Sequence, residues 1–457
     1  MNYGRVPIIT PYKEVTDDNI KEILECAFTI FTINNSDMDF LFGYYRGMQP
    51  ILHRQKHIRP EICNMVVENH AYEIVNFRTG YLLEKPIQYV ALSSEVDDVS
   101  LSIFNGYNTD LSKESQDMEI AQDQAICGTA YRLVLPNDKY DGKFNDIPYT
   151  IDRIDPRQAF VVYSSALGNK ALLGVVVLIE KDENNNTVFV LQAYSKDTFY
   201  VYKIGGVLVS KTTHAYGTIP LIEYPHNRFR LGAFEPVIPM LDAINTIQSN
   251  RVDGIEQFIQ ALLVFKNVEI KKEMLQQLQE LGAINISDNG EITASVEYLQ
   301  QELKQDQVQT LIDYLVSTVY KIAGLPSRTK NGSGDTGQAV LFRDGWTEIE
   351  SKIQDTELSF KKSEREFIKI ALNYTRTITL NKVNLPSRLL EIKFTRRNYE
   401  NIVQKTTVLT QMLGSDKIAP RLAFVVCGLF QDPEAAYQES QEYAKSLKGE
   451  TDATESE

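Results

Sequence analysis

The sequence predicts an α+β protein in which helices come first, a β-rich region follows and long helices then return. Apolar residues recur at helical spacing near the N-terminus, and eight short segments between residues 129 and 225 are rich in Val, Ile, Tyr and Phe. Long amphipathic stripes begin near residue 234. With 457 residues and 43 % apolar content, the chain can form roughly two to four folding units.

The first third of the chain is expected to be helical. Thr16 and Asp17 can cap a first helix. Its apolar face has i, i+3, i+4 spacing and consists of Ile20, Ile23, Leu24, Ala27, Phe28 and Phe31. Asp37 is interpreted as the cap of a second helix, because the residues after it lack the Gly and Glu of a calcium-binding loop. Residues 43–60 contain Gly and Pro without periodicity and predict an extended arm.

Further helices are expected over residues 64–83 and 96–127, with a strand between them in LLEKPIQYV. The β-rich region then begins, and turn sequences such as DENNNT separate its segments. The eight expected strands are TAYRLVL, YTIDRI, AFVVYS, LLGVVVLIE, TVFVLQAY, TFYVYKI, VLVSK and PLIEY. We therefore predict a domain of meandering β-hairpins.

Two long helices are predicted after this domain. The first covers residues 234–265, with an apolar stripe that consists of Val237, Leu241, Ile244, Ile247, Ile255, Phe258, Ile259 and Leu262. The second begins at residue 305, with Val308, Leu311, Ile312, Leu315, Val319 and Ile322 on one side. Between them, AINISDNGEITASVEYL alternates apolar and polar residues about an Asp-Asn-Gly turn, which predicts a β-hairpin. The two helices would therefore be antiparallel and carry a small α/β cap.

The stretch NGSGDTGQA places Gly332, Gly334 and Gly337 in the spacing G-x-G-x-x-G. A dinucleotide-binding site also needs a strand before the first glycine, and a helix ending precedes this one instead. Asp335 and Gln338 fit a capping box, so the simpler interpretation is a loop that leads into a long helix over residues 336–373. A kink in that helix is expected at Gly345.

Composition and charge exclude several functional classes. The chain has 61 acidic and 47 basic residues and a net charge of −14, which is not expected of a protein that coats nucleic acid or anionic membrane. Apolar runs such as LLGVVVLI are shorter than a membrane span, and the N-terminus lacks the blocks of a signal peptide. We therefore expect a soluble protein made inside a cell.

No catalytic, cofactor-binding or metal-ligating constellation is evident. The cysteines are scattered without a C-x-x-C pair and are expected to be reduced thiols: Cys26, Cys63, Cys127 and Cys427. The five His residues form no cluster with metal-ligand spacing. Adjacent or near-adjacent acidic residues such as Asp97 and Asp98 cannot share a helix face and are expected to be solvated. The sequence thus predicts no enzyme.

A set of motifs in the same order along the chain nevertheless carries a resemblance to a known family. They are Tyr44, Tyr45 and Gly47 in YYRGMQPI; Asn69, Asn76 and Gly80 in ENHAYEIVNFRTGYLLEKPI; GTAY from Gly128; Asp155 and Pro156; PLIEY from Pro220; Gly232, Phe234, Glu235, Asp242, Asn245 and Ser249 in GAFEPVIPMLDAINTIQS; and Gly337, Ala339, Arg343 and Trp346. Together they cover about residues 40–350. This set resembles the portal proteins of long-tailed bacteriophages of Gram-positive hosts.

The resemblance implies the portal fold and a ring, typically dodecameric, at one vertex of the viral capsid. Its parts would be a wing (1–233, helical to about 128 and β-rich over 129–225), a stem of two helices (234–265 and 305–325), a small α/β clip (266–304), a tunnel loop with the start of a long helix (326–344), a long kinked wing helix and strand (345–398), a helical crown (399–448) and a disordered acidic tail (449–457). Double-stranded DNA would pass through the channel of the ring during packaging and ejection. Assembly in the host cytoplasm and a final place in the virion are implied as well.

The resemblance also implies roles for particular residues. In the tunnel loop, Arg328, Lys330, Asn331 and Ser333 would face DNA, and Gly332, Gly334 and Gly337 would supply hinge mobility. Neighbouring subunits would pack through the stem residues Leu241, Ile244, Ile255, Phe258 and Leu262. The large terminase subunit, which hydrolyses ATP, would dock on the clip and later give way to a head completion or adaptor protein, and the clip candidates are Glu269, Glu273, Glu280, Asp288 and Glu291. Major capsid and scaffolding proteins would be further partners, and no cofactor or membrane would be needed.

The acidity fits a channel through which DNA must slide, because a strongly basic wall would hold the phosphates too tightly. Residues 266–303 contain three basic and seven acidic residues. A solvated docking surface would have the same composition. Two other classes remain open at this point: a different ring-forming, scaffold or adaptor protein without catalysis, and a nucleotide-dependent enzyme that uses the glycine loop.

Overall fold

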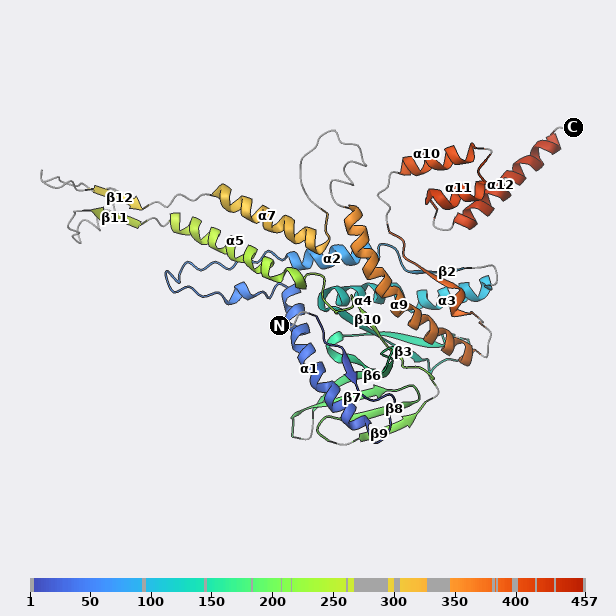
Figure 1. The fold of residues 1–457 in the computed structure, drawn as a ribbon, viewed down its shortest axis with the longest axis horizontal. Coiled ribbons are helices and arrows are strands. Elements are labelled where there is room, and N and C mark those ends of the chain that lie inside the picture. The colour runs from blue at the N-terminus through green and yellow to red at the C-terminus, as the bar shows by residue number, and fades with distance from the viewer. Residues whose placement is uncertain are drawn as a thin grey trace. The chain divides into compact units, whose positions relative to one another are not determined.

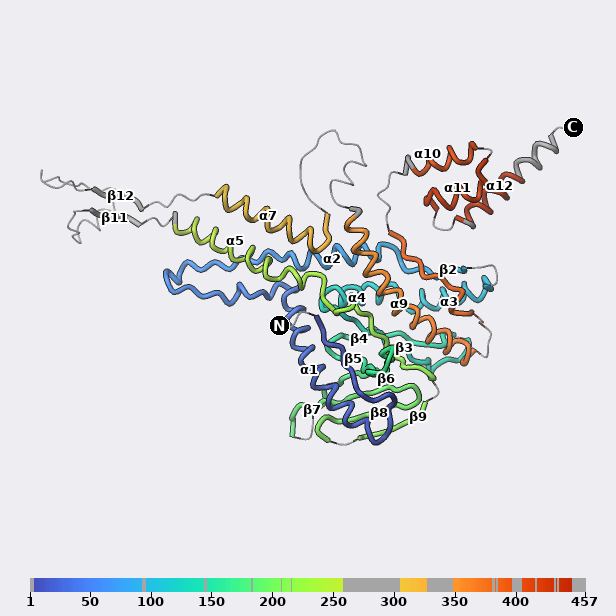
Figure 2. Tube along the Cα trace, in the orientation of Figure 1, coloured from blue at the N-terminus to red at the C-terminus, as the bar shows by residue number. Residues whose placement is uncertain are grey.

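Figures 1 and 2 show the computed structural model, which has the α+β class that the sequence predicts. The structure describes residues 4–92, 96–143, 146–181, 184–206, 208–214, 216–259, 262–266, 295–299, 305–326, 346–379, 383, 385–396, 402–415, 417–430 and 433–454. The chain divides into two compact units. The first contains Met1–Phe42, Glu73–Pro236 and Tyr320–Glu457, and the second contains Gly43–Tyr72 and Val237–Val319.

Helix α1 (Ile20–Tyr45) is one continuous helix, so the prediction of a second helix capped by Asp37 is wrong. The apolar stripe runs on past Asp37, because Met38 and Leu41 are buried and keep the helical period. An aspartate inside a helix costs only a few tenths of a kcal/mol in propensity, about the level that packing overrides. Burial of the stripe therefore decides the structure here.

The larger sheet of the first unit has six strands in the order β1-β5-β6-β7-β8-β9. Five of them form the expected meander of antiparallel neighbours: β5 (Ala159–Ser164), β6 (Ala171–Lys181), β7 (Thr187–Tyr194), β8 (Thr198–Lys203) and β9 (Leu208–Thr213). Strand β1 (Ile8–Thr10) pairs in parallel with β5 and was not predicted. Helix α1 packs on this sheet, and the tilted rings of Phe31 and Phe160 lie 4.9 Å apart between centroids.

A second sheet, in the order β10-β3-β4, contains the other three predicted strands: β3 (Thr129–Pro136), β4 (Tyr149–Ile154) and β10 (Leu221–Pro225). All eight strands of the β-rich region are thus confirmed. Two short strands, β2 (Gln88–Ala91) and β13 (Leu390–Lys393), pair as a separate ladder. The expected helices α2 (His70–Leu82), α3 (Asp98–Asp110) and α4 (Lys113–Cys127) are present, although α2 begins six residues later than expected.

Helix α9 (Trp346–Ile378) runs along the open edge of strand β10. The Ser363 hydroxyl donates to the carbonyl of Glu223 at 2.7 Å, and the Ser359 hydroxyl donates to the carbonyl of Pro225 at 2.6 Å. Alternate strand carbonyls are about 6.6 Å apart and helix positions i and i+4 about 6.0 Å apart, so the two serines match two carbonyls. The two hydroxyls thus satisfy two carbonyls on the edge of β10 that no neighbouring strand of the described chain pairs. The helix extends five residues beyond the predicted end, and its expected start at 336–345 lies outside the described residues.

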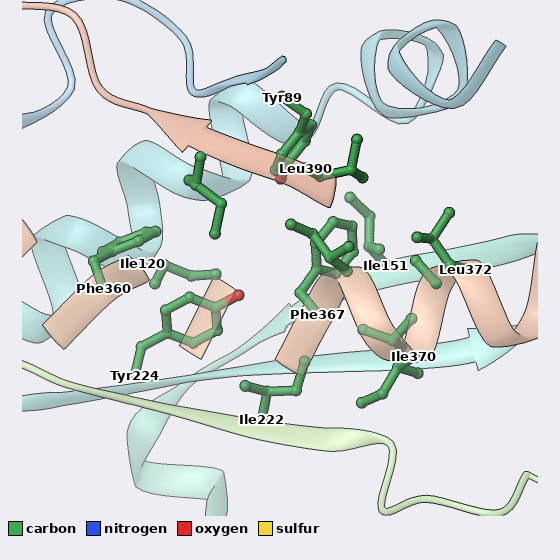
Figure 3. Packing of buried hydrophobic residues seen from close by; sticks show 14 of the residues in the cluster. Tyr89, Ile120, Ile151, Ile222, Tyr224, Phe360, Phe367, Ile370, Leu372 and Leu390 are labelled. Carbon is green, nitrogen blue, oxygen red and sulfur yellow. The ribbon is translucent and has the colours of Figure 1, made fainter. Parts of the chain in front are cut away.

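The main apolar core lies between α9, the β10-β3-β4 sheet and the β2-β13 ladder (Figure 3). Phe360 and Phe367 of α9 and Tyr224 of β10 are almost completely buried in it. Phe367 and Tyr149 meet edge to face at 6.3 Å between ring centroids. The core thus fixes the long helix to strands from three separate parts of the sequence.

Four charged side chains are buried beside this core. Lys113 of α4 lies 2.8 Å from Asp117 and 2.6 Å from Glu364 of α9. Arg132 of β3 pairs with both carboxylates. Two cations thus balance two anions, which a buried cluster requires because an unpaired charge would be very costly.

The second unit contains helix α5 (Ile238–Ile259), a two-stranded ladder of β11 (Leu262–Lys266) and β12 (Ser295–Leu299), and helix α7 (Gln305–Ala323), which extends to the unit's border. The predicted helix over 234–265 is wrong at both ends, because 235–237 form a 3₁₀ turn (η3) and Leu262 begins a strand. A short apolar run such as LLVF fits either structure, and pairing with β12 selects the strand. The turn of the hairpin predicted for AINISDNGEITASVEYL lies outside the described residues, and its last five residues, SVEYL, form β12 and pair with β11.

Among the residues described after strand β13, three helices are present: α10 (Ile402–Leu413), α11 (Pro420–Cys427) and α12 (Pro433–Thr454). They coincide with the region expected to be helical at 399–448. The prediction that residues 449–457 are disordered is wrong for its first six residues, because α12 continues to Thr454. A helix that is already formed adds each further residue at little cost, so the low apolar content of the tail does not end it.

Candidate functional site

The second unit holds an extended arm against helix α5, and this contact uses backbone groups of the arm and side chains of the helix. The N–H of Glu68 donates to Asn245 Oδ1 at 2.8 Å, and the N–H of Val66 donates to Ser249 Oγ at 2.9 Å. The N–H of Asn64 donates to Asp253 Oδ1 at 2.7 Å. We call these three pairs the arm ladder.

The arm ladder follows from the repeat distances of the two structures. The three helix residues are each four positions apart, which is about 6.0 Å along an α-helix. The three arm residues are each two positions apart, which is about 6.6 Å along an extended chain. All three helix side chains are buried: Asn245, Ser249 and Asp253. A helix face that looks polar in sequence is therefore an inward face that satisfies buried backbone donors.

Asp253 also receives charged partners from the arm. Arg54 and Lys56 lie 3.1 and 3.0 Å from its carboxylate. Burial alone would raise the pKa of Asp253, but hydrogen bonds from Asn64 and Lys56 together with the charge of Arg54 hold it below its ordinary value. The carboxylate thus stays ionised and fixes the end of the arm to the helix.

At the beginning of the arm, the Tyr44 hydroxyl donates to Asp242 at 2.8 Å. Burial raises the pKa of Tyr44 far above its ordinary value, and the nearby Asp242 charge adds to the shift. Asn69 donates to the carbonyl of Tyr45 at 2.8 Å, and Gly47 has a φ of 93°, a backbone conformation that favours glycine. The contact between the arm and helix α5 therefore brings together residues from motifs that are separate in the sequence. They are Tyr44, Tyr45, Gly47, Asn69, Asp242, Asn245 and Ser249.

The sequence model of the family described as "Phage portal protein, SPP1 Gp6-like" matches residues 29–452 of the chain. The match contains the arm, both long helices and the three C-terminal helices. The chain belongs to this family of phage portal proteins.

A curated relative supports the same assignment. The portal protein of Bacillus phage SPP1 is 23 % identical to the chain over 223 residues, which is 48 % of this chain and 43 % of that relative. The aligned part thus spans less than half the length of the relative. Portal proteins form a structural, non-catalytic family.

The predicted packing residues of the first portal stem helix have different surroundings. Leu241 and Ile244 are buried within the chain itself, whereas the side chain of Ile255 is 43 % exposed. Leu262 lies on strand β11 and not on the helix, and Phe258 lies on α5, with its side-chain environment outside the described part. Of the five residues, Ile255 is the one whose described side chain is available to another molecule.

Sequence reasoning missed a second exposed apolar surface, on α7. The expected stripe is split between two faces, because Ile312 is buried while Leu311 is 48 % exposed. Tyr314, which the predicted stripe did not include, is 64 % exposed. Arg251 of α5 donates to Gln305 at 2.7 Å and to Gln309 at 2.8 Å, so side chains bridge the two helices. The helices α5 and α7 lie side by side in Figure 1. The signal was present in the sequence: α7 has apolar residues on more of its circumference than one buried face needs.

The residues predicted to face DNA, to act as loop hinges and to dock terminase lie outside the described residues. They are Arg328, Lys330, Asn331, Ser333, Gly332, Gly334 and Gly337 of the expected tunnel loop and Glu269, Glu273, Glu280, Asp288 and Glu291 of the expected clip. Their roles stay predictions.

Three further findings concern the described part of the chain. It contains no group of three or more His, Cys, Asp or Glu side chains placed to hold a metal ion. None of its helices combines the length and the apolar character that a bilayer crossing requires. All four cysteines are free thiols, and burial raises the pKa of Cys127 well above its ordinary value.

Proposed function

We propose that the chain forms a ring, expected to be dodecameric, at one vertex of a phage capsid and that double-stranded DNA passes through this ring during packaging and ejection. The observation that carries the proposal is the family match over residues 29–452. The ring would be a conduit without catalysis of its own, and a separate terminase would supply the energy of ATP hydrolysis.

The stem of the proposed ring consists of α5 and α7, and the clip begins with the β11–β12 ladder. Exposed apolar side chains on both helices support contact between copies of the chain: Val252 and Ile255 on α5, Leu311 and Tyr314 on α7. Exposed apolar residues that cluster on neighbouring elements are typical of protein interfaces. In this arrangement the first unit with α9 forms the wing, and α10 to α12 form the crown.

The partners of the proposed ring are those that the portal role requires. Terminase and then a head completion or adaptor protein would dock on the clip, while capsid and scaffolding proteins would meet the wing. The finished ring would be part of the virion after assembly in the host cytoplasm. The loop between Pro326 and Trp346 would project into the channel and face DNA.

A packaging assay tests this function. A phage that lacks its portal gene is grown on host cells that supply either the intact chain or a variant in which two glycines replace residues 328–337. We expect the variant to form rings and heads, verified by electron microscopy, but to yield far fewer DNA-filled heads. A variant that changes Lys139 and Lys196 to Gln, two exposed residues of the first unit, serves as the matched control. Equal filling with the loop variant and the control would contradict the proposed role of the loop.

A further inference from the structure

The first unit contains an open groove of about 1100 Å³. Its walls come from the start of the chain, from β5 and β10, and from one face of α9. Sites for small molecules have volumes of about 300–1,000 Å³. The groove is thus large enough for a segment of polypeptide.

The groove carries unbalanced positive charge. Lys170, Arg228 and Lys362 line it, are exposed, and form no ion pair with any described residue. Two other cations of the lining are already neutralised, because Arg230 pairs with Glu223 at 2.6 Å and Lys369 pairs with Glu366 at 2.7 Å. A concave basic surface on a chain of net charge −14 selects an acidic partner.

Apolar side chains and carboxylates in the lining favour a polypeptide over nucleic acid. Pro7, Ile9, Leu221 and Ile370 supply apolar wall, and Glu366 lies among the cations. Surfaces that bind DNA are much more positively charged than surfaces that bind protein. The mixed lining suits a peptide with a few separated carboxylates better than the closely spaced phosphates of a nucleic acid.

One acidic segment of suitable length is the C-terminus of the chain itself. Residues 449–457 contain four acidic residues and no basic one. Among the described residues, none after Ile370 lines the groove, so helix α12 of the same chain does not fill it. We propose that the groove binds the acidic C-terminal segment of a second copy of the chain.

The interaction would join two copies through a surface separate from the exposed faces of α5 and α7. Each copy contributes one groove and one C-terminal segment, so the contact is head to tail and can repeat from copy to copy. It does not require a closed ring or the passage of DNA. Its failure would therefore leave the proposed function untouched, and a failure of the proposed function would leave this contact testable.

A binding titration tests the proposal with the full-length chain. The probe is a fluorescently labelled synthetic peptide of residues 446–457, and its anisotropy is followed as protein is added. The groove variant is R228E/K362E, and the control variant K139E/K196E changes the same number of exposed charges in the same unit outside the groove. A peptide in which the four acidic residues are replaced by their amides tests the charge dependence, and a labelled duplex oligonucleotide tests the alternative partner.

We expect saturable binding of the acidic peptide that weakens at least tenfold in R228E/K362E and less than twofold in the control. We also expect binding to weaken with added salt and to be lost with the amide peptide. A peptide with lysine at the four acidic positions should prefer R228E/K362E. Equal binding to both variants, or no saturable binding to the unchanged chain, would overturn the proposal. A groove-dependent affinity for the oligonucleotide without one for the peptide would overturn it as well.

Discussion

Arg132 and Glu364 are 232 positions apart in the sequence and form an ion pair at 3.4 Å in which both side chains are completely buried. Glu364 also accepts a hydrogen bond from Tyr224 at 2.9 Å. Burial lowers and neighbouring anions raise the pKa of Arg132, and the net shift is upward, so the guanidinium stays charged. Helix α9 is thus fixed to the β10-β3-β4 sheet by charge as well as by the apolar core.

Replacing Glu364 with Gln should lower the free energy of unfolding by about 3–5 kcal/mol. The change leaves Arg132 and Lys113 with one carboxylate, Asp117, in a buried site. Urea unfolding followed by circular dichroism measures the effect. Glu366→Gln on the same helix is the control, because the pair of Glu366 with Lys369 is exposed and should matter by less than about 0.5 kcal/mol. Equal effects of the two changes would show that the buried cluster does not fix the helix.

Replacing Ser249 with Ala should loosen the arm. The N–H of Val66 loses its partner, which costs about 1 kcal/mol for a half-buried amide. Exchange of the Val66 amide with deuterium, read by NMR or mass spectrometry, should become about fivefold faster. Thr246→Ala is the matched control, because the Thr246 hydroxyl is exposed and bonds only the carbonyl of Asp242 within the helix. Unchanged exchange at Val66 would mean that the arm ladder does not hold the arm.

Replacing Gly128 with Ala should destabilise the first unit by about 3 kcal/mol or more. Its φ is 85°, and an added Cβ would lie 1.9 Å from the carbonyl oxygen of Arg230. Gly106→Ala in α3 is the contrasting change, because no atom lies within 4 Å of its Cβ position and alanine is the better helix former by about 1 kcal/mol. Thermal unfolding of both variants should show shifts of opposite sign. A shift of the same sign and size would contradict the close approach at Gly128.

Stability should depend on pH through His226. Burial, together with the charge of Arg78, lowers the pKa of His226 to about 3. The unfolded chain binds a proton at this residue near pH 6.5 and the folded chain does not, so stability falls as the pH drops from about 6.5 toward 3, by about 1.4 kcal/mol per unit. Burial raises the pKa of Asp123 to about 6, which acts in the opposite direction.

The contribution of His226 is therefore measured as the difference between the unchanged protein and His226→Gln. Urea midpoints are compared between pH 7 and pH 5 for both proteins. Asp123 is present in both, so its effect cancels in the difference. The unchanged protein should lose more stability on acidification than the variant. Parallel pH profiles would show that His226 is not held neutral by the fold.

Elements with a regular pattern of side chains within their own segment could be predicted from the sequence. All eight strands of the β-rich region could be predicted because β-branched and aromatic residues alternate between clear turns. Strand β1 could not, because three residues give no pattern and its partner β5 lies 150 positions away. The end of α5 failed for a similar reason, since pairing of Leu262 with Leu299 decides between helix and strand.

The polar residues of α5 show that contacts between distant segments could not be predicted at the site either. Asn245 and Ser249 could be chosen from the sequence as part of a motif, but not their partners in the arm about 180 positions earlier. A helix with a polar residue at every fourth position is normally expected to expose that face to solvent. In the arm ladder this face of α5 is buried instead, because the arm packs against it. The burial can be recognised only from a structure that contains both the arm and α5.

The most direct test of the account is negative-stain electron microscopy of the purified protein, with class averages analysed for rotational symmetry. The account predicts rings with a central hole and about twelve lobes. Single globular particles that persist even when scaffolding and capsid proteins are co-expressed would contradict it.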